Sequence, residues 1–372
     1  MMKSIRELYR FELYKILHSK LTVSFVLILA ALSVIMGLQL SKGARDLIIY
    51  DEVRTLNGLV INDETVDRMN ADLVNIDGLE KEENYKYTGL AHTVNMLNEG
   101  DGLISAEQFY QNRLKFQHLN MEELRLSDGE KQWWTQQEAE IQKPFVYVPQ
   151  LNVKTFAEYM TNICLMAILL TAICLSGVFA GEYRKNMDQL MFSCRNGRRQ
   201  TFVAKIAAGM TFSIVWILLF TILLALSLWL RTGLDGLSGV IQLEVPYSAY
   251  NLSFLQFIGI QIIIVVTATV LFAAMAMALS AIFKNGVAVM GTMVGIYLIS
   301  QFVNIPLKFR LISQVKAMFP TELITVWSLA DFRLIKIAGN YHSMYSVAPA
   351  IYIIIAIVLV LAGHLAFKQS QR

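Results

Sequence analysis

The sequence predicts an all-α integral membrane protein. Hydrophobic residues make up 55% of the 372 residues and charged residues only 16%, whereas a soluble chain carries about 25% charged residues. Several apolar runs reach the roughly 20 residues that a helix needs to cross the hydrocarbon core of a bilayer. We therefore expect six transmembrane helices, an N-terminal interfacial helix and a mostly helical extracellular domain.

Charge divides the chain into three parts. Residues 42–154 hold twelve Lys/Arg against twenty Asp/Glu, although the whole chain has a net charge of +3. We expect residues 1–41 to form the interfacial helix and the first span, and residues 42–154 to form the acidic extracellular domain. Residues 155–372 then supply spans two to six, with a cytoplasmic loop at 182–205. This distribution of charge does not favour binding to nucleic acid.

The N-terminal stretch Ile5–Lys20 is amphipathic, and five Lys/Arg lie within the first 20 residues. No small-residue cleavage site follows the next apolar run, so we expect no removable signal peptide. The pattern predicts a helix on the cytoplasmic leaflet, with a plain basic tail as the alternative. Leu21–Leu40 is the first span, where Ser33 and Gly37 permit close approach of another helix.

Two capping boxes predict helix starts in the acidic domain, Ser105–Gln108 and Ser127–Glu130. A third helix is expected after Asn62. Phe145–Val148 is expected to form an extended link to the second span. The expected inward positions of the three helices are Phe109, Leu114, Phe116 and Leu119; Trp133, Trp134 and Ile141; and Val66, Met69 and Leu73. The domain either gates or receives a substrate, or only covers the outer mouth.

Five further apolar runs complete the expected six spans. They are Phe156–Ala180, Ile206–Leu230, Ser253–Phe283, Val287–Ile305 and Ala348–Phe367. The fourth span is too long for one straight crossing, so we expect it to tilt or to extend beyond the bilayer. Short outer helices are expected in Pro306–Val347. The inner segments hold fourteen Lys/Arg against six in the two later outer segments, which places both termini in the cytoplasm.

Polar residues inside the apolar spans are the candidates for a translocation path. They are Asn162, Gln261, Thr267, Gln301 and Asn304. An interhelical hydrogen bond is the alternative role for each of them. Asp and Glu are nearly missing from the spans, which argues against a proton- or sodium-driven carrier, because such carriers need ionisable groups near the midplane.

The loop between the second and third spans has a distinctive order of residues. Six Lys/Arg lie in Glu182–Lys205 against two acids, and apolar residues recur at helical spacing from Tyr183 to Met191. This pattern predicts a short amphipathic helix beneath the membrane. A basic loop that only fixes topology is the alternative.

The loop resembles the corresponding loop of ABC exporter permeases of the type-2 family. The resemblance rests on a Glu-Tyr-Arg triplet at Glu182, on Asp188, on a Leu-Met-Phe step, on an Asn-Gly-Arg-Arg turn and on the closing Lys205. The family often has Gly-Thr where this chain has Asn186-Met187. In that family the loop holds a coupling helix that docks on an ATPase subunit.

The resemblance implies a function and a set of partners. The chain would be the permease subunit of an ATP-driven exporter, paired with a second permease subunit, the same or related. The partner ATPase would hold ATP and Mg, and this chain would hold no cofactor. The implied ATPase contacts are Glu182, Tyr183, Arg184, Asp188, Arg195, Arg198 and Arg199. The large outer insertion looks like that of plasma-membrane permeases of Gram-positive bacteria that move peptides, antibiotics or ions.

Motifs for chemistry within this chain are missing. The sequence has no GxxxxGK[ST] loop, no HExxH and no GxSxG. Cys164, Cys174 and Cys194 have no metal-ligand spacing. We therefore expect no catalytic or metal site and no enzyme activity in this chain. A membrane sensor or scaffold, whose outer domain binds a ligand and relays to a cytoplasmic regulator, is the alternative function.

Overall fold

Long apolar helices dominate the computed structural model, which describes residues 2–39, 51–74, 85–98, 104–184, 197–303 and 305–369. Among these residues, five helices are long and apolar enough to cross a membrane. They are α2 (Lys20–Gln39), α8 (Leu151–Leu175) continued by α9 (Gly177–Arg184), α11 (Gly197–Thr232), α12 (Phe254–Phe283) and α16 (Met344–Gln369). The chain is therefore an α-helical, multi-pass membrane protein. The expected fifth span corresponds to α13 (Gly286–Phe302), an apolar helix of 17 residues.

The central helix of the bundle is α12, which packs against α8, α11, α13 and α16. Its start is fixed by a capping box, in which Ser253 Oγ accepts from the Gln256 amide and the Gln256 side chain accepts from the Ser253 amide. It ends at Lys284, whose left-handed backbone (φ 53°) stops the helix. Small buried residues from Ala273 to Ala281 let its neighbours approach closely.

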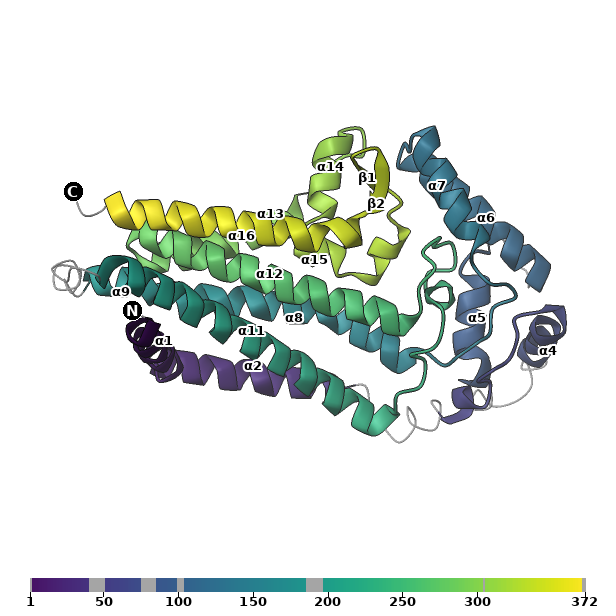
Figure 1. The fold of residues 1–372 in the computed structure, drawn as a ribbon. Coiled ribbons are helices and arrows are strands. Elements are labelled where there is room, and N and C mark those ends of the chain that lie inside the picture. The colour runs from purple at the N-terminus through teal and green to yellow at the C-terminus, as the bar shows by residue number, and fades with distance from the viewer. Residues whose placement is uncertain are drawn as a thin grey trace.

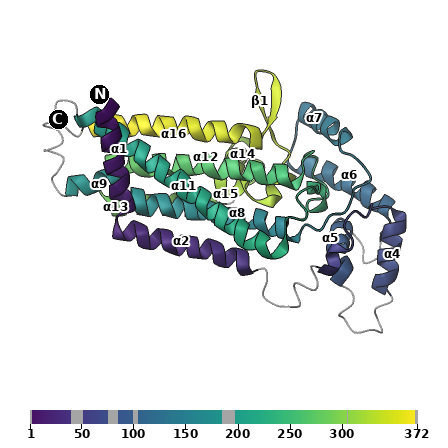
Figure 2. The same ribbon diagram turned by 60° about the horizontal axis from the view of Figure 1, so that its bottom comes forward.

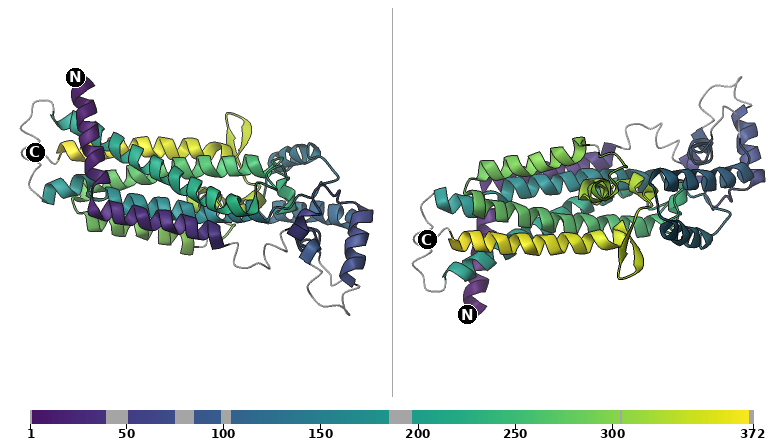
Figure 3. Two further views of the ribbon diagram at one scale, coloured as in Figure 1. Left: turned by 90° about the horizontal axis from the view of Figure 1, so that it is seen from below. Right: turned by 90° about the horizontal axis from the view of Figure 1, so that it is seen from above.

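One end of the bundle is crossed by α1 (Met2–Leu17), which runs at a steep angle to the long helices (Figure 2). We call this end the base; it comprises α1, α9 and the first turns of α11, Gly197–Lys205. In both views of Figure 3 the purple α1 and the end of the yellow α16 lie there. The first helix and the C-terminal end of the last helix thus lie at the same end of the protein.

The acidic domain forms the opposite end (Figure 1). We call it the head; it comprises α4 (Asp63–Val74), α5 (Thr88–Asn95), α6 (Ala106–Glu123) and α7 (Asp128–Ala139). Both expected capping boxes are present, at the starts of α6 and α7. The expected extended link is also confirmed, because Phe145 and Tyr147 exchange backbone hydrogen bonds of 2.7–2.9 Å with residues 58–61.

The inward face of α6 differs from the prediction. Phe109 is buried as expected, but Leu114 and Leu119 are 40% and 48% exposed. Arg113 and Gln117 are buried in their place. The reason is a partner on α7, because Glu138 accepts from Arg113 Nη2 at 2.7 Å and from Gln117 at 3.3 Å. A paired and hydrogen-bonded charge can be buried where an isolated one cannot.

The segment that precedes α16 also differs from the prediction. It contains the short helices α14 (Arg310–Ala317) and α15 (Pro320–Leu323), as expected, but also an antiparallel hairpin of β1 (Leu334–Ile337) and β2 (Asn340–Ser343). The turn between the strands is Ala338–Gly339, and both residues have positive φ. This segment packs on the head, so the structure here depends on long-range contacts.

Glu130 of α7 fastens the head to that segment. Its carboxylate accepts from Arg310 Nη2 at 2.5–2.6 Å and from the Leu334 amide at 3.1 Å. Close by, Trp134 Nε1 donates to the carbonyl of Phe332 at 2.6 Å. The head is therefore joined to the residues before α16 by buried polar contacts that would be costly to leave unpaired.

The Glu130 contacts make the stability of the head depend on pH. Burial would raise the pKa of Glu130, but Arg310, Ser127 and the Leu334 amide outweigh it and hold the pKa below its usual 4.5. A carboxyl group whose pKa is lowered by folding stabilises the folded state at pH values above its unfolded-state pKa. That stabilisation is lost as the pH falls through the folded-state pKa. We expect Glu130→Gln to cost about 2 kcal/mol at pH 7 and less as the pH falls below 4.5.

Melting temperatures of the detergent-solubilised wild type and variant, taken from pH 7 to pH 3.5, check this expectation. The exposed neighbour Glu122 supplies the control, because Glu122→Gln should leave the melting temperature unchanged at every pH. A gap between wild type and Glu130→Gln that stayed constant down to pH 3.5 would contradict the proposed ionisation.

Candidate functional site

The α8–α9 junction is a break in a transmembrane helix that a side chain of α12 repairs. Ser280 Oγ donates to the carbonyl of Ser176 at 2.6 Å and accepts from the amides of Phe179 and Ala180 at 3.2 and 3.0 Å. A helix break leaves backbone donors and acceptors unpaired, and in an apolar bundle each of them needs a partner. A hydroxyl can donate and accept at once, so Ser280 ties α9 to α12.

A second tie to α9 comes from Lys205 of α11, whose side chain is 0% exposed. Its Nζ donates to Glu182 Oε1 at 2.5 Å, to Glu12 Oε2 at 3.0 Å and to the carbonyl of Val178 at 3.1 Å. An ammonium group has three N–H donors, and these three acceptors match them. Lys205 therefore joins α11 to α9 and to α1.

Lys15 of α1 completes the group. Its Nζ lies 2.7 Å from Glu12 Oε2 and 3.1 Å from Glu182 Oε1. Burial lowers the pKa of Lys15, but the two carboxylates outweigh that effect and raise it. We call Glu12, Lys15, Glu182 and Lys205 the four-charge cluster. Two positive and two negative charges balance there, so three helices meet around a neutral and hydrogen-bonded polar centre.

The loop residues singled out in the sequence have different positions. Glu182 lies in the four-charge cluster. Lys284 Nζ lies 4.9 Å from the centroid of the Tyr183 ring, which is a cation–π contact. Arg199 is exposed on α11. The backbones of Arg184 and Arg198 belong to α9 and α11. Asp188, Arg195 and the expected helix from Tyr183 to Met191 lie wholly or largely outside the described residues.

The helix that carries the expected third span begins before the span itself. The sequence places Lys205 at the end of a polar loop and begins the span at Ile206, with a helix able to start after the Asn196-Gly197 turn. In the structure α11 begins at Gly197, and Lys205 lies eight residues inside the helix. A charged residue is tolerated there because Glu12 and Glu182 neutralise it. Glu12 and Lys15 were missed, although an acid and a base three residues apart on the predicted N-terminal helix were a visible signal.

The four translocation-path candidates that the structure describes differ in burial and in hydrogen-bond partners. Gln261 is buried and donates to the carbonyls of Ile324 at 2.6 Å and Ala157 at 3.2 Å, which are interhelical bonds. Thr267 donates to carbonyls of its own helix. Asn162 and Gln301 are exposed on α8 and α13. Asn304 lies outside the described residues.

Known proteins provide no further guide to this site. No protein-family model matches the chain, and no curated protein matches it. Among the described residues, no group of three or more His, Cys, Asp or Glu is placed to hold a metal ion. Inferences about function therefore depend on the residues and geometry of the base.

The four-charge cluster should behave as one unit in a double-mutant cycle. Lys205→Met leaves two carboxylates facing one ammonium, and Glu182→Gln leaves the opposite imbalance, so each should cost about 3–5 kcal/mol. The double variant keeps a balanced Glu12–Lys15 pair. We expect its loss to fall short of the sum by about 0.5–3 kcal/mol.

Equilibrium unfolding of the four proteins in mild detergent measures the cycle. Lys20→Met, at an exposed lysine three residues after α1, is the control and should change little. Strict additivity of the two single losses would show that Lys205 and Glu182 do not interact as the structure describes.

Proposed function

We propose that the chain is the membrane-spanning permease subunit of an ATP-driven ABC exporter in a cell membrane. The observation that carries the proposal is the four-charge cluster, because it connects the helices on either side of residues 185–196 to the rest of the bundle. The first of these helices is α9 and the second is α11. The order of residues in Glu182–Lys205 resembles that of the loop on which an ATPase subunit docks in type-2 ABC exporter permeases.

The arrangement of charge supports placing the base in the cytoplasm. Basic residues are concentrated in the segments at the base, and cytoplasmic segments of membrane proteins carry an excess of Lys and Arg. The acidic head would then be extracellular, and α1 would lie along the inner leaflet, where its exposed Phe11 and Tyr14 can enter the lipid.

The buried contacts of α9 suggest how movement would pass into the bundle. Glu182 binds Lys205 of α11 and Lys15 of α1, while the backbone at the start of α9 is held by Ser280 of α12. Separating any of these pairs inside an apolar bundle leaves an unpaired charge or amide. A push on the loop would therefore move α1, α9, α11 and α12 together, as in rigid-body switching.

In this mechanism the chain transmits force and the partner supplies it. ATP and Mg would bind between two ATPase subunits, and closure of that pair would displace the loops of two permease subunits. Arg198, Arg199 and the loop residues Asp188 and Arg195 are the proposed docking contacts. The head, fastened through Glu130 to Arg310, would follow the bundle and cover the outer mouth of the pathway.

Charge reversal in the loop tests docking. We expect Arg198→Glu with Arg199→Glu to abolish co-purification of the proposed ATPase partner, because acidic side chains would replace the basic docking surface. Membrane insertion should be unchanged. The matched control is Lys308→Glu with Lys336→Glu, two exposed lysines near the head. Equal recovery of the ATPase with both variants, or a companion that does not hydrolyse nucleotide, would overturn the proposal.

A second experiment separates docking from coupling. The double variant Lys205→Met with Glu182→Gln keeps a balanced Glu12–Lys15 pair at the base. Its fold is checked by its melting temperature, and its binding to the ATPase by co-purification, before hydrolysis is measured. Because α9 is then no longer tied to α11 and α1, permease-stimulated ATP hydrolysis in nanodiscs should drop to the basal rate of the ATPase. Stimulation equal to wild type would show that force does not pass through the four-charge cluster.

A further inference from the structure

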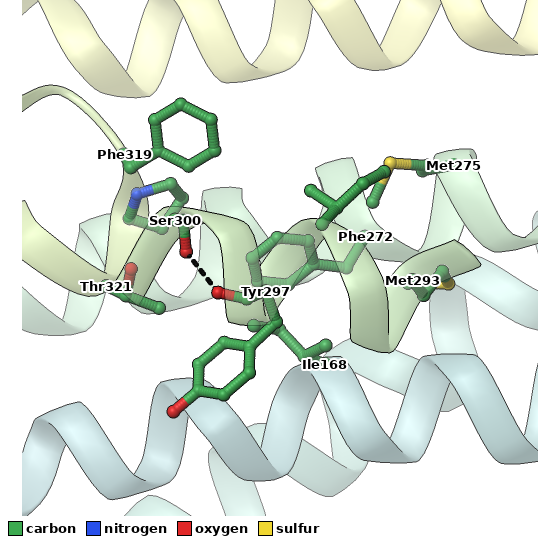
Figure 4. A pocket seen from close by; sticks show the side chains of 10 residues that line it. Ile168, Phe272, Met275, Met293, Tyr297, Ser300, Phe319 and Thr321 are labelled. Atoms are coloured by element: carbon green, nitrogen blue, oxygen red, sulfur yellow. Dashed lines mark hydrogen bonds between the residues drawn. The ribbon is translucent and has the colours of Figure 1, made fainter. Parts of the chain in front are cut away.

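A lateral recess lies between α8, α12, α13 and the residues around α15 (Figure 4). It contains about 280 Å³ of empty space, including its open mouth. The lining residues are Ile168, Phe272, Met275, Met293, Ile296, Tyr297, Ser300, Phe319, Pro320 and Thr321. Because this volume includes open space outside the lining side chains, the recess is a shallow, partly open groove. It therefore suits a slender ligand, or one end of a longer one.

The recess is polar at one end and apolar at the other. In Figure 4, Ser300 and Thr321 lie on the side of Phe319, while Met275 and Met293 lie at the opposite side. The first side is nearer the head, because α13 starts beside Ser176 at the base and runs toward Phe302. Methionine side chains adapt to the shape of an apolar partner. The gradient suits an amphiphile whose apolar end points toward the middle of the bundle.

Thr321 provides the specific signal for a ligand. Its side chain is 5% exposed, and its Oγ1 has no hydrogen-bond partner among the described residues. Ser300 Oγ, by contrast, donates to the carbonyl of Tyr297 at 2.7 Å. A buried hydroxyl left unpaired costs about 1–3 kcal/mol. A ligand atom that accepts or donates a hydrogen bond at this position would remove that cost.

The outer face of α13 beside the recess indicates where the ligand comes from. Leu298, Ile299 and Phe302 are 45%, 63% and 81% exposed. Exposed apolar side chains on a membrane-spanning bundle face hydrocarbon. Whatever enters the recess from this side therefore arrives from the bilayer, where acyl chains are the abundant species.

We propose that the recess binds one acyl chain of a membrane lipid. The chain end lies against Met275, Met293 and Phe272, and a polar atom near the lipid ester reaches the Thr321 hydroxyl. This inference goes beyond the proposed exporter function and does not require an ATPase, so either can fail without the other.

Photolabelling tests the proposal. The protein, reconstituted in nanodiscs, is irradiated with a phosphatidylcholine that carries a diazirine near the end of one acyl chain, and labelled residues are located by mass spectrometry. We expect labelling to concentrate on Met275 and Met293. Ile296→Trp, which fills the recess, should reduce that labelling to background, whereas Ile299→Trp, on the exposed face of the same helix, should leave it unchanged.

Thr321→Val tests the hydroxyl and remains informative if Ile296→Trp fails to fold. Valine keeps the shape but loses the hydrogen bond, so retention of the labelled lipid should fall roughly five-fold. Unchanged labelling in Thr321→Val would remove the role of the hydroxyl and overturn the assigned pose. Label spread evenly along the outside of α13, or a recess filled by a second copy of the chain, would overturn the site itself.

Discussion

Burial of Lys205 is the constraint on which the architecture of the base depends. An ammonium group inside an apolar bundle is tolerated only if opposite charges and hydrogen-bond acceptors surround it. Glu12 comes from 193 residues away in the sequence and Glu182 from 23. Because both carboxylates must reach one nitrogen, α1 is held across the bundle end and α9 is held against α11. The neighbouring break after α8 is then stabilised by Ser280.

The head uses the same principle at the other end of the molecule. Arg113 is buried because Glu138 faces it, and Glu130 is buried because Arg310 and the Leu334 amide bind it. Between the two ends the helices contact one another mainly through apolar and small side chains. Apolar contacts are not directional, whereas charge-assisted hydrogen bonds fix position. Two rigid ends joined by an apolar bundle would suit a protein whose helices move as units.

Sequence patterns were sufficient where local rules decide the structure. Long apolar runs predicted the membrane class, and the Ser105 and Ser127 capping boxes predicted two helix starts correctly. The rest depended on partners far away in the chain. The buried side of α6 is polar because of Glu138, and the β1–β2 hairpin forms where Leu334 contacts Glu130. Glu182 was selected as a docking residue, yet its neighbour Lys205 was assigned to a loop, because nothing local reveals that a lysine has two carboxylate partners.

The central claim is that α1 moves with α11 because the four-charge cluster holds them together. Double electron–electron resonance tests it by measuring the distance between the two helices. Spin labels on the exposed positions Tyr14 and Val203, in a Cys194→Ser background, report the distance between α1 and α11 with the ATPase partner present. The account predicts one narrow distance in the nucleotide-free and ATP-bound states, and a broad distribution in Glu182→Gln with Lys205→Met. A wild-type distance that changes with nucleotide, or a double variant that stays narrow, would contradict it.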